Sequence, residues 1–325
     1  MKTRMPEVAV QIVTHNNEQT IIACIQSLRS QRYKNFRLLV IDNASTDATC
    51  RLVSSLRIPI IKNKKNIGYG AAHNVGLAKC KSPYILTLNP DIVLERNFLT
   101  ALVSAMEHEQ KTVGSAQAAL YRVNGLQEAS DRIDSAGLSL TPYRRQRLRM
   151  EGRVLPKATP SPIFGPDGAA AFYRRAMLTD INVGDGIFDE AFFMHKEDVD
   201  VCWRAQLRGW TSVFIPDARA YHIRTFRAGQ RHRVSAMLQK TAVRNRYYLL
   251  IKNEIPLLFF RDFFWILLYE IGMLVYMVIS ERSSLDAYRM VIKELPVLFQ
   301  KRRRIQSNLC VRASDIAQWF RWKPV

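Results

Sequence analysis

The strongest constraint on the fold is the alternation of strand-like and helix-like segments through the first hundred residues. The strand-like apolar runs are residues 8–13, 36–41, 58–61 and 84–88, and the helix-like segments are residues 18–30, 47–56 and 70–79. Strands that are apolar on both faces and separated by helices predict a parallel sheet covered on both sides. Ligands bind beyond the carboxyl ends of the strands in such a sheet. The sequence therefore predicts an α/β fold whose functional residues follow these strands.

Polar residues follow the second and third strand-like runs. Asp42 and Asn43 come directly after the second run. An acid there can accept a hydrogen bond from a nucleobase or a ribose hydroxyl, or can cap the next helix. The glycine-containing segment from Asn66 to Asn74 lets backbone approach a phosphate near a helix N-terminus. It lacks the third glycine of the dinucleotide fingerprint and does not follow the first strand, which argues against a nicotinamide-dependent enzyme.

Asp91 ends the fourth strand-like run, within the sequence Asn89-Pro90-Asp91. A carboxylate at this position can hold a divalent cation that bridges a diphosphate and neutralises charge as the diphosphate leaves. Asn-Pro-Asp is also a good turn sequence. The motif by itself therefore leaves both interpretations open.

A second group of acids lies in Glu197-Asp198-Val199-Asp200, at the start of a helix-like block. Helical spacing predicts an ion-pair cluster of Glu197, Asp200 and Arg204 on one face. Asp198 points about 100° away and is a candidate general base. The alternative role for these acids is favourable pairing with the helix dipole. His222, taken alone, is more often a packed or surface residue than a ligand.

The chain is expected to be helical throughout from about residue 234. On a helical wheel, one half of residues 255–280 is entirely apolar, and the charged residues fall on the other half: Glu254, Arg261, Asp262 and Glu270. The uncharged run 271–279, which only the polar Ser280 extends before Glu281, is much shorter than the about 20 residues that a spanning helix needs, which disfavours a transmembrane segment. Two interpretations stay open: a helix lying in the membrane interface, and a helix hairpin or homodimer interface.

The formal net charge is +20, and most of it lies in two stretches. Residues 201–250 contain ten basic residues and one acid, and residues 301–325 contain seven basic residues and one acid. Such a surface attracts nucleic acid, anionic lipid or phosphorylated substrates. No nucleic-acid recognition module accompanies the charge, so nucleic acid is not the expected partner. Five cysteines without metal or redox spacing, and the lack of a signal peptide, favour the cytosol or a cytosolic surface.

Taken in order, these motifs resemble inverting glycosyltransferases of family 2, which have the GT-A fold, and in particular their rhamnosyltransferase-like branch. The resemblance covers roughly residues 8–226. It rests on six blocks: residues 12–16, 40–47, 66–76 and 88–91, then Gly186-Ile187-Phe188-Asp189-Glu190 with residues 197–200, and Pro216-Asp217-Ala218 with His222.

The resemblance implies a Rossmann-like, mostly parallel central sheet flanked by helices, within a catalytic domain of residues 1–230. Its nucleotide-sugar half would be residues 1–115 and its acceptor half residues 116–230. Residues 231–325 would form a helical, basic and amphipathic membrane-associating region.

The resemblance also implies roles for individual residues. Asp198 would be the base that deprotonates the acceptor, and Asp91 and His222 would hold Mg²⁺ or Mn²⁺. The donor would be bound by His15, Asn16, Asp42, Asn43, Asn66, Gly68, Asn74 and Asn89, and the acceptor by Asp167, Gly168 and Glu197.

Two departures from the family pattern refine the expectation. Asn89 replaces the first acid of the family's Asp-x-Asp metal motif, so we expect weaker metal binding. The Gln-x-x-Arg-Trp motif of processive synthases is absent, although Gln206-Leu207-Arg208-Gly209-Trp210 superficially echoes it. We therefore expect the addition of one sugar or few.

The resulting hypothesis is transfer of a sugar, with inversion, onto a polyprenyl-diphosphate-linked or other glycan acceptor. The donor would be dTDP-L-rhamnose or a UDP-sugar. The protein would be cytoplasmic and peripheral on the inner, anionic face of the plasma membrane. The alternatives are a basic nucleic-acid-binding protein and a sugar nucleotidyltransferase. The latter would need a glycine-rich basic loop where this chain has Thr14-His15-Asn16.

Overall fold

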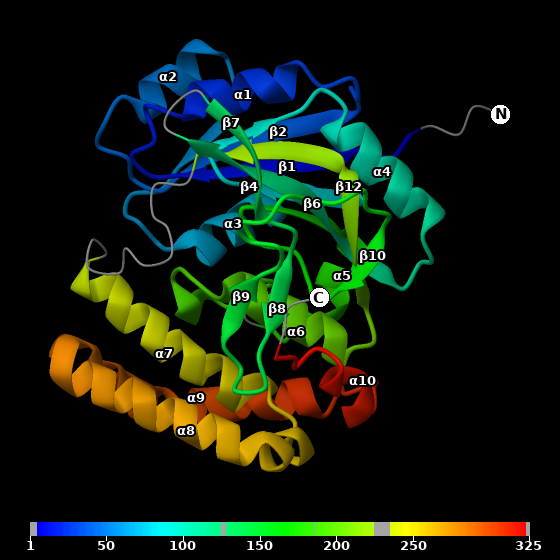
Figure 1. Ribbon diagram of the computed structural model, residues 1–325. Coiled ribbons are helices and arrows are strands. Elements are labelled where there is room, and N and C mark those ends of the chain that lie inside the picture. The colour runs from blue at the N-terminus through cyan, green and yellow to red at the C-terminus, as the bar shows by residue number, and fades with distance from the viewer. Residues whose placement is uncertain (1–4, 125–127, 185, 224–234, 323–325) are drawn as a thin grey trace.

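The computed structural model describes residues 5–124, 128–184, 186–223 and 235–322 of the 325-residue chain. A ten-stranded sheet forms its centre, with strand order β10-β12-β6-β11-β4-β1-β2-β3, and with β5 on β12 and β7 on β6 (Figure 1).

The strands are β1 (Val8–Thr14), β2 (Phe36–Asp42), β3 (Ile60–Lys62), β4 (Tyr84–Leu88), β5 (Ile92–Leu94), β6 (Val113–Asn124), β7 (Glu128–Ser135), β8 (Leu138–Leu140), β9 (Gln146–Leu148), β10 (Ser161–Ile163), β11 (Ala170–Arg174) and β12 (Thr211–His222). The helices are α1 (Ile21–Arg29), α2 (Thr49–Ser55), α3 (Tyr69–Leu77), α4 (Phe98–His108), α5 (Arg175–Asp180), α6 (Glu197–Leu207), α7 (Ala236–Asn253), α8 (Pro256–Ser280), α9 (Asp286–Gln306) and α10 (Ala313–Ala317), with 3₁₀ turns η1 (Glu190–Phe192) and η3 (Arg282–Leu285).

The four predicted strands form the parallel part of the sheet, in the order β4-β1-β2-β3. Every residue of β1 and β4 is buried, because helices cover both faces of the sheet at this point. One face packs against α1 and α4 and the other against α3, α5 and α6. The predicted α/β architecture is therefore confirmed.

The second half of the sheet is mixed, where the resemblance implied a mostly parallel sheet: β12 runs parallel to β6, whereas β5, β7, β10 and β11 pair antiparallel with their neighbours. Strand β11 lies between β4 and β6 and runs antiparallel to both. Its register pairs Ala170 with Leu88. The residues that precede β11 therefore lie beside the residues that follow β4, at the carboxyl edge where ligands are expected.

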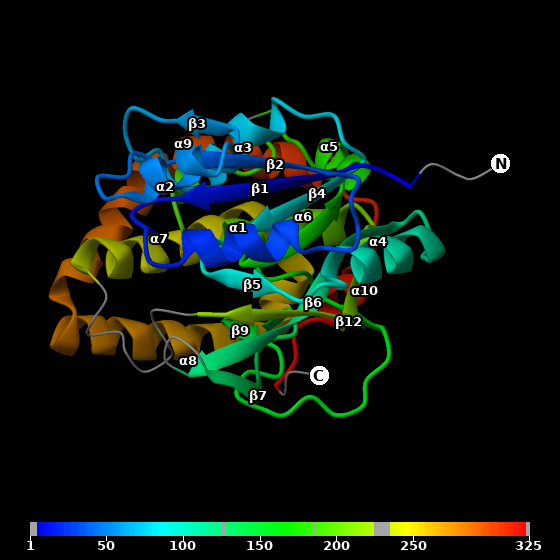
Figure 2. The same ribbon diagram turned by 90° about the horizontal axis from the view of Figure 1, so that it is seen from above.

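The helical C-terminal part lies on the side of α6 that faces away from the sheet (Figure 1). Helix α7 packs on α6, and α8 and α9 lie on opposite sides of α7 when the molecule is seen from above (Figure 2). This confirms the prediction of a helical region for residues 235–322.

Helix α8 places its polar half toward the protein and its apolar half outward. Arg144, whose side chain is fully buried, pairs with Glu254 at 2.7 Å and with Asp262 at 2.6 Å. Arg246 pairs with Glu270 at 2.6 Å. By length and composition α8 could cross a membrane. The short uncharged run in the sequence had disfavoured a transmembrane segment.

Arg144 carries a testable consequence for stability. Arg144→Met leaves the buried carboxylate of Glu254 without its arginine, whereas Asp262 keeps Arg261 at 2.6 Å, so we expect the free energy of unfolding in urea to fall by about 3–5 kcal/mol. The matched control is Arg37→Met, because Arg37 pairs with Glu7 at 2.7 Å but is 78% exposed. Loss of such an exposed pair changes stability by about 1 kcal/mol or less. Equal losses in the two variants would contradict the assignment.

Candidate active site

Four acids from separate parts of the chain converge on the hydroxyl of Tyr69, in the first turn of α3. This hydroxyl donates a hydrogen bond to the carbonyl of Gly168 at 3.0 Å. Burial, and then the negative charges around it, raise the pKa of Tyr69 well above its ordinary value of 10. The acids responsible are Glu197, Asp198, Asp167 and Asp91. The predicted metal, base and acceptor residues are therefore brought into one site.

Asp91 faces His222 across the end of the sheet. His222 is the last residue of β12, and its antiparallel pairing with Ile92 of β5 brings the two side chains together. Nε2 of His222 lies 3.4 Å from Oδ1 of Asp91, and Nδ1 lies 2.8 Å from Oδ2 of Asp134. Because the Asp134 carboxylate only accepts, Nδ1 carries a hydrogen, and in the neutral ring the lone pair of Nε2 then points toward Asp91.

This pair has the chemistry of a divalent cation site. Oδ1 of Asp91 is buried and accepts no hydrogen bond among the described residues. A carboxylate oxygen and an imidazole nitrogen that face each other without a proton between them fit a cation, and the second carboxylate behind His222 fixes the ring as in known metal sites. Within the described ranges, no group of three or more His, Cys, Asp or Glu residues is placed to hold a metal. A cation here would take its remaining ligands from phosphate and water.

Asp198 stands in the first turn of α6, where backbone amides hold its carboxylate. Oδ2 accepts a hydrogen bond from the amide of Gly168 at 3.1 Å, and Oδ1 accepts one from the amide of Val199 at 2.8 Å. Burial, and then the charge of Asp167, raise the pKa of Asp198 to about 6. A carboxylate with this pKa is ionised at neutral pH and is a better proton acceptor than an exposed aspartate.

Glu197 does not join the ion-pair cluster that the sequence predicted. Asp200 and Arg204 do pair, at 2.8 Å. Glu197 is two helical turns from Arg204, a rise of about 10 Å, which is too far for an ion pair. Burial, and then the charge of Asp198, raise the pKa of Glu197 to about 8, so Glu197 is protonated at neutral pH.

The loops after β1 and β2 hold the predicted nucleoside residues together. Nδ1 of His15 lies 2.9 Å from the carbonyl of Asn43, and the side-chain oxygen of Asn16 accepts a hydrogen bond from the amide of Thr46 at 2.8 Å. Asp42 accepts a hydrogen bond from the amide of Ser45 through Oδ2, while its Oδ1 is buried without a hydrogen-bond partner in the described part of the chain. An oxygen of this kind can accept a hydrogen bond from a nucleobase or a ribose hydroxyl, and that contact stays a prediction.

The remaining predicted donor residues make their contacts within the protein. Asn43 donates a hydrogen bond to Asn66 at 2.8 Å, and Asn74 donates one to the carbonyl of Phe188 at 2.8 Å. Gly68 has φ +93°, and a Cβ on it would lie 2.4 Å from the carbonyl oxygen of Phe193. The lack of a side chain at Gly68 therefore lets the segment before α6 pack against it. The contact of Gly68 with a phosphate and the contact of Asn74 with a donor stay predictions.

Hydrogen bonds of backbone amides hold together the residues that follow β4 and those that precede β11. The amide of Asn89 donates a hydrogen bond to the carbonyl of Ala169 at 2.8 Å, and the amide of Asp167 donates one to the side chain of Gln117 at 2.7 Å. These bonds fix the residues that follow β4 against those that precede β11.

Sequence reasoning missed Tyr69, Asp134 and Gln117. Tyr69 lies within the predicted glycine-containing segment but carries no signal of its own. Asp134 lies in β7 and Gln117 in β6. Both strands come to lie beside the site through the pairing of β6 with β11 and with β7, and no local sequence pattern indicates these pairings.

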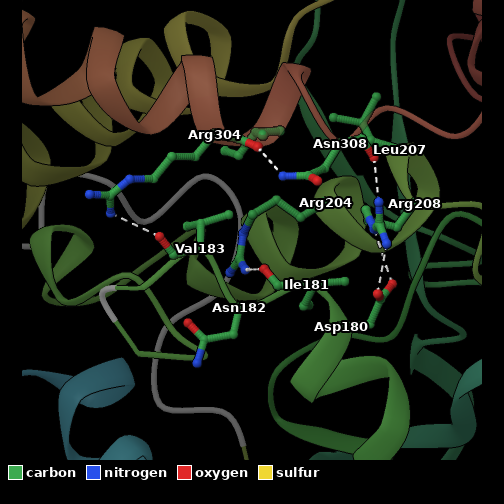
Figure 3. Close-up of a pocket in the computed structure, with 10 residues that line it drawn as sticks. Asp180, Ile181, Asn182, Val183, Arg204, Leu207, Arg208, Arg304 and Asn308 are labelled. Carbon is green, nitrogen blue, oxygen red and sulfur yellow. Dashed lines mark hydrogen bonds and ion pairs between the residues drawn. The ribbon is translucent and has the colours of Figure 1, made fainter.

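A pocket of about 230 Å³ lies further along α6, between its C-terminal turn, α5 and the end of α9 (Figure 3). Its arginines bind protein groups: Arg208 pairs with Asp180 at 2.7 Å, and Arg204 donates a hydrogen bond to the carbonyl of Ile181 at 2.7 Å. Arg304 of α9 donates one to the carbonyl of Val183 at 2.9 Å. The pocket therefore lies at the interface of α9 with α5 and α6, and it is separate from the acidic site.

The pKa of Glu197 carries a consequence for stability that is independent of any ligand. A carboxyl whose folded-state pKa is raised from 4.5 to about 8 stabilises the fold at low pH and loses that contribution as the pH rises through this window. One pKa unit corresponds to about 1.4 kcal/mol. We therefore expect Glu197→Gln to raise the free energy of unfolding by at least about 1 kcal/mol at pH 8 and to change it little at pH 4.5. The exposed control Asp131→Asn should change it little at both pH values, and a gain from Glu197→Gln that is equal at pH 4.5 and 8 would contradict the assignment.

Comparison with known proteins agrees with this geometry. Residues 9–181 match the sequence family described as Glycosyl transferase family 2. The chain is 24% identical over 255 residues to the N-acetylglucosaminyl-diphospho-decaprenol L-rhamnosyltransferase of Mycobacterium tuberculosis, covering 70% of this chain and 78% of that protein. It is 32% identical over 109 residues to the UDP-Glc:alpha-D-GlcNAc-diphosphoundecaprenol beta-1,3-glucosyltransferase of Escherichia coli, covering 33% of this chain and 43% of that protein.

Other curated relatives match over about a third of their own length. Among solved structures, GalNAc-T7 with UDP, GalNAc and Mn²⁺ aligns with a TM-score of 0.62 at 16% identity, covering 77% of this chain and 48% of that one. This likeness shows the same GT-A fold. Since the family match spans more than half of the chain and includes the loops that form the donor side of the site, the chain belongs to glycosyl transferase family 2.

Proposed function

We propose that this protein transfers a sugar from a nucleotide-diphospho-sugar to an acceptor hydroxyl by a single displacement that inverts the anomeric carbon. The observation that carries the proposal is the buried carboxylate of Asp198, which two backbone amides orient in the same acidic site as Asp91 and His222. Asp198 accepts the proton of the acceptor hydroxyl as that oxygen attacks. The bond from the anomeric carbon to the diphosphate oxygen breaks, and the nucleoside diphosphate leaves with the electron pair.

Two sets of residues would hold the donor. Asp42, with His15, Asn16 and Asn43, would bind the nucleoside at the ends of β1 and β2. Asp91 and His222 would hold a divalent cation, Mg²⁺ or Mn²⁺, which when bound neutralises the charge on the departing diphosphate. The GalNAc-T7 structure contains Mn²⁺ and UDP, which supports this arrangement.

We propose dTDP-L-rhamnose as the donor and a polyprenyl-diphosphate-linked glycan as the acceptor. The mycobacterial relative, whose name specifies an L-rhamnosyltransferase and a diphospho-decaprenol acceptor, supports both assignments. The Escherichia coli relative is named for UDP-Glc, so UDP-sugars belong in the same test. Protonated Glu197, with Asp167 and Gly168, would border the acceptor, in the half of the catalytic domain that we assign to residues 116–230.

Substitution of the base and of the metal ligand separates the two roles. We expect Asp198→Asn to lower kcat by 10²-fold or more, the scale of a lost general base, while a nucleotide sugar with Mn²⁺ still raises the melting temperature. Asp91→Ala should lose both the transfer and the Mn²⁺-dependent part of that thermal shift. A panel of dTDP-rhamnose and UDP-sugars identifies the donor. Full activity in both variants, with Asp131→Asn as the folded control, would overturn the site assignment.

We further propose that the protein is cytoplasmic and peripheral on the inner face of the plasma membrane, with α8 lying along the bilayer surface. The exposed large apolar residues of α8 are Leu257, Phe260, Phe263, Phe264, Trp265, Leu267, Leu268, Ile271, Leu274, Val275, Tyr276, Val278 and Ile279. Soluble monomers rarely expose a contiguous patch of this size. Five free cysteines fit a reducing compartment.

The ion pairs of α8 favour lying on the bilayer over crossing it. A spanning orientation would pull Asp262 and Glu270 away from Arg144 and Arg246 and break both ion pairs. A groove of about 520 Å³ between α7 and α9 adds the side chains of Arg289 and Lys293, which anionic headgroups attract. Lys240 in the same groove pairs with Asp286 at 2.8 Å. A homodimer through the same apolar face is the competing arrangement.

Vesicle binding tests this placement. We expect sedimentation with vesicles that contain phosphatidylglycerol, weaker sedimentation with phosphatidylcholine alone, and at least tenfold weaker binding for Phe260→Ser/Phe264→Ser, because one buried Phe contributes about 1.5–3 kcal/mol. Arg289→Gln/Lys293→Gln should reduce only the preference for anionic vesicles. A stable dimer by light scattering that ignores vesicles would establish the competing arrangement.

A further inference from the structure

The segment that leads into the catalytic helix has a strained backbone. Phe193, His195 and Lys196 have φ values of +61°, +66° and +74°, in the left-handed region that residues with side chains avoid. Each such residue costs of the order of 1 kcal/mol or more, so surrounding contacts must hold the segment in this shape. Lys196 directly precedes Glu197 and Asp198, so the shape of the segment decides where the first turn of α6 begins.

Helix α7 supplies the contacts that hold this segment. Nδ2 of Asn245, which is fully buried, lies 2.9 Å from the carbonyl of Phe192, 2.8 Å from that of Met194 and 2.7 Å from that of His195, so its two hydrogens are shared among three acceptors. Its Oδ1 accepts from Arg244 at 2.9 Å, which fixes the orientation of the amide. A single side chain of the C-terminal helices therefore satisfies three carbonyls of the segment.

Buried ion pairs fasten both ends of the same region. Lys252, two turns after Asn245 on α7, lies 2.5 Å from Asp189 and 2.9 Å from Asp200. Lys301 of α9 lies 2.7 Å from Asp189. Although burial opposes it, the two lysines lower the pKa of Asp189 below its ordinary value, so its charge is retained. The segment is thus tied to α7 and α9 at its start through Asp189, and α6 is tied to α7 through Asp200, two residues after Asp198.

The other side of the segment reaches the base through Tyr69. The carbonyl of Phe193 accepts a hydrogen bond from the amide of Tyr69 at 2.6 Å. The Tyr69 hydroxyl holds the carbonyl of Gly168, and the Gly168 amide holds the Asp198 carboxylate. A path of hydrogen bonds joined by covalent links of the chain therefore runs from Asn245 through residues 192–195, Tyr69 and Gly168 to Asp198.

We infer that Asn245 is a positioning residue: it holds residues 192–196, three of which have a left-handed backbone, in their observed shape and thereby fixes the Asp198 carboxylate in the acidic site. Asn245 lies behind the segment and touches no reacting group. The inference rests on the proposed function, because it assigns Asn245 a role through the proposed base. It makes the C-terminal helices part of the catalytic structure.

The variant Asn245→Asp tests this inference with almost no change in volume. It places a carboxylate oxygen against three carbonyl oxygens in place of the donor. We expect kcat to fall by about 10²-fold, the scale of a misplacement of about 1 Å. The KM for the nucleotide sugar should be little changed, because Asp42 and His15 lie at the ends of other strands. Asn308→Asp, which adds the same charge at an exposed position of the C-terminal region, should keep wild-type kcat.

Hydrogen exchange provides a readout that needs no activity. Asn245→Asp should speed amide exchange at least tenfold in residues 192–199 and leave residues 84–88 of β4 unchanged. Unchanged exchange, or wild-type kcat in a folded Asn245→Asp protein, would overturn the inference. If Asp198→Asn instead keeps full activity, the proposed base is wrong and the exchange result still decides whether Asn245 holds the segment.

Discussion

The antiparallel insertion of β11 between β4 and β6 is the constraint on which the site depends. It places Asp167 and Gly168, which precede β11, against Asn89 and the residues that follow β4. The amide of Gly168 can then hold Asp198 from α6. In an all-parallel sheet those residues would lie at the opposite edge, and the acids of α6 would have no partner beside the proposed metal ligands.

Two kinds of buried acid lie within twelve residues of each other. Asp189 and Asp200 are neutralised by lysines and an arginine and hold the helices together. Glu197 and Asp198 form no such ion pair with any residue that the structure describes, and burial raises the pKa of both. Paired acids stabilise the fold, whereas acids with raised pKa values are available for proton transfer at a cost in stability.

The sequence predicted the parallel strands, the acids that follow them and the apolar half of α8, because all three are local patterns. It could not predict the direction of β11, since a short apolar run carries no sign of its orientation. It could not reveal which half of α8 faces the protein, because the partner Arg144 lies more than a hundred residues earlier. The role of Asn245 could not be predicted for the same reason, because a buried asparagine on a helix is recognised only by the carbonyls that it contacts in the folded protein.

The outward apolar half of α8 and the buried polar contacts of α7 have a joint geometric consequence. If α8 rests on a bilayer, then the contacts of α6 with α7 and of α8 with the rest of the protein set the height of the proposed base above the lipid headgroups. Such an enzyme would be selective for the length of its acceptor. A hydroxyl one sugar nearer to or farther from the lipid anchor would arrive at the wrong level, so selection of the acceptor would come partly from distance to the membrane.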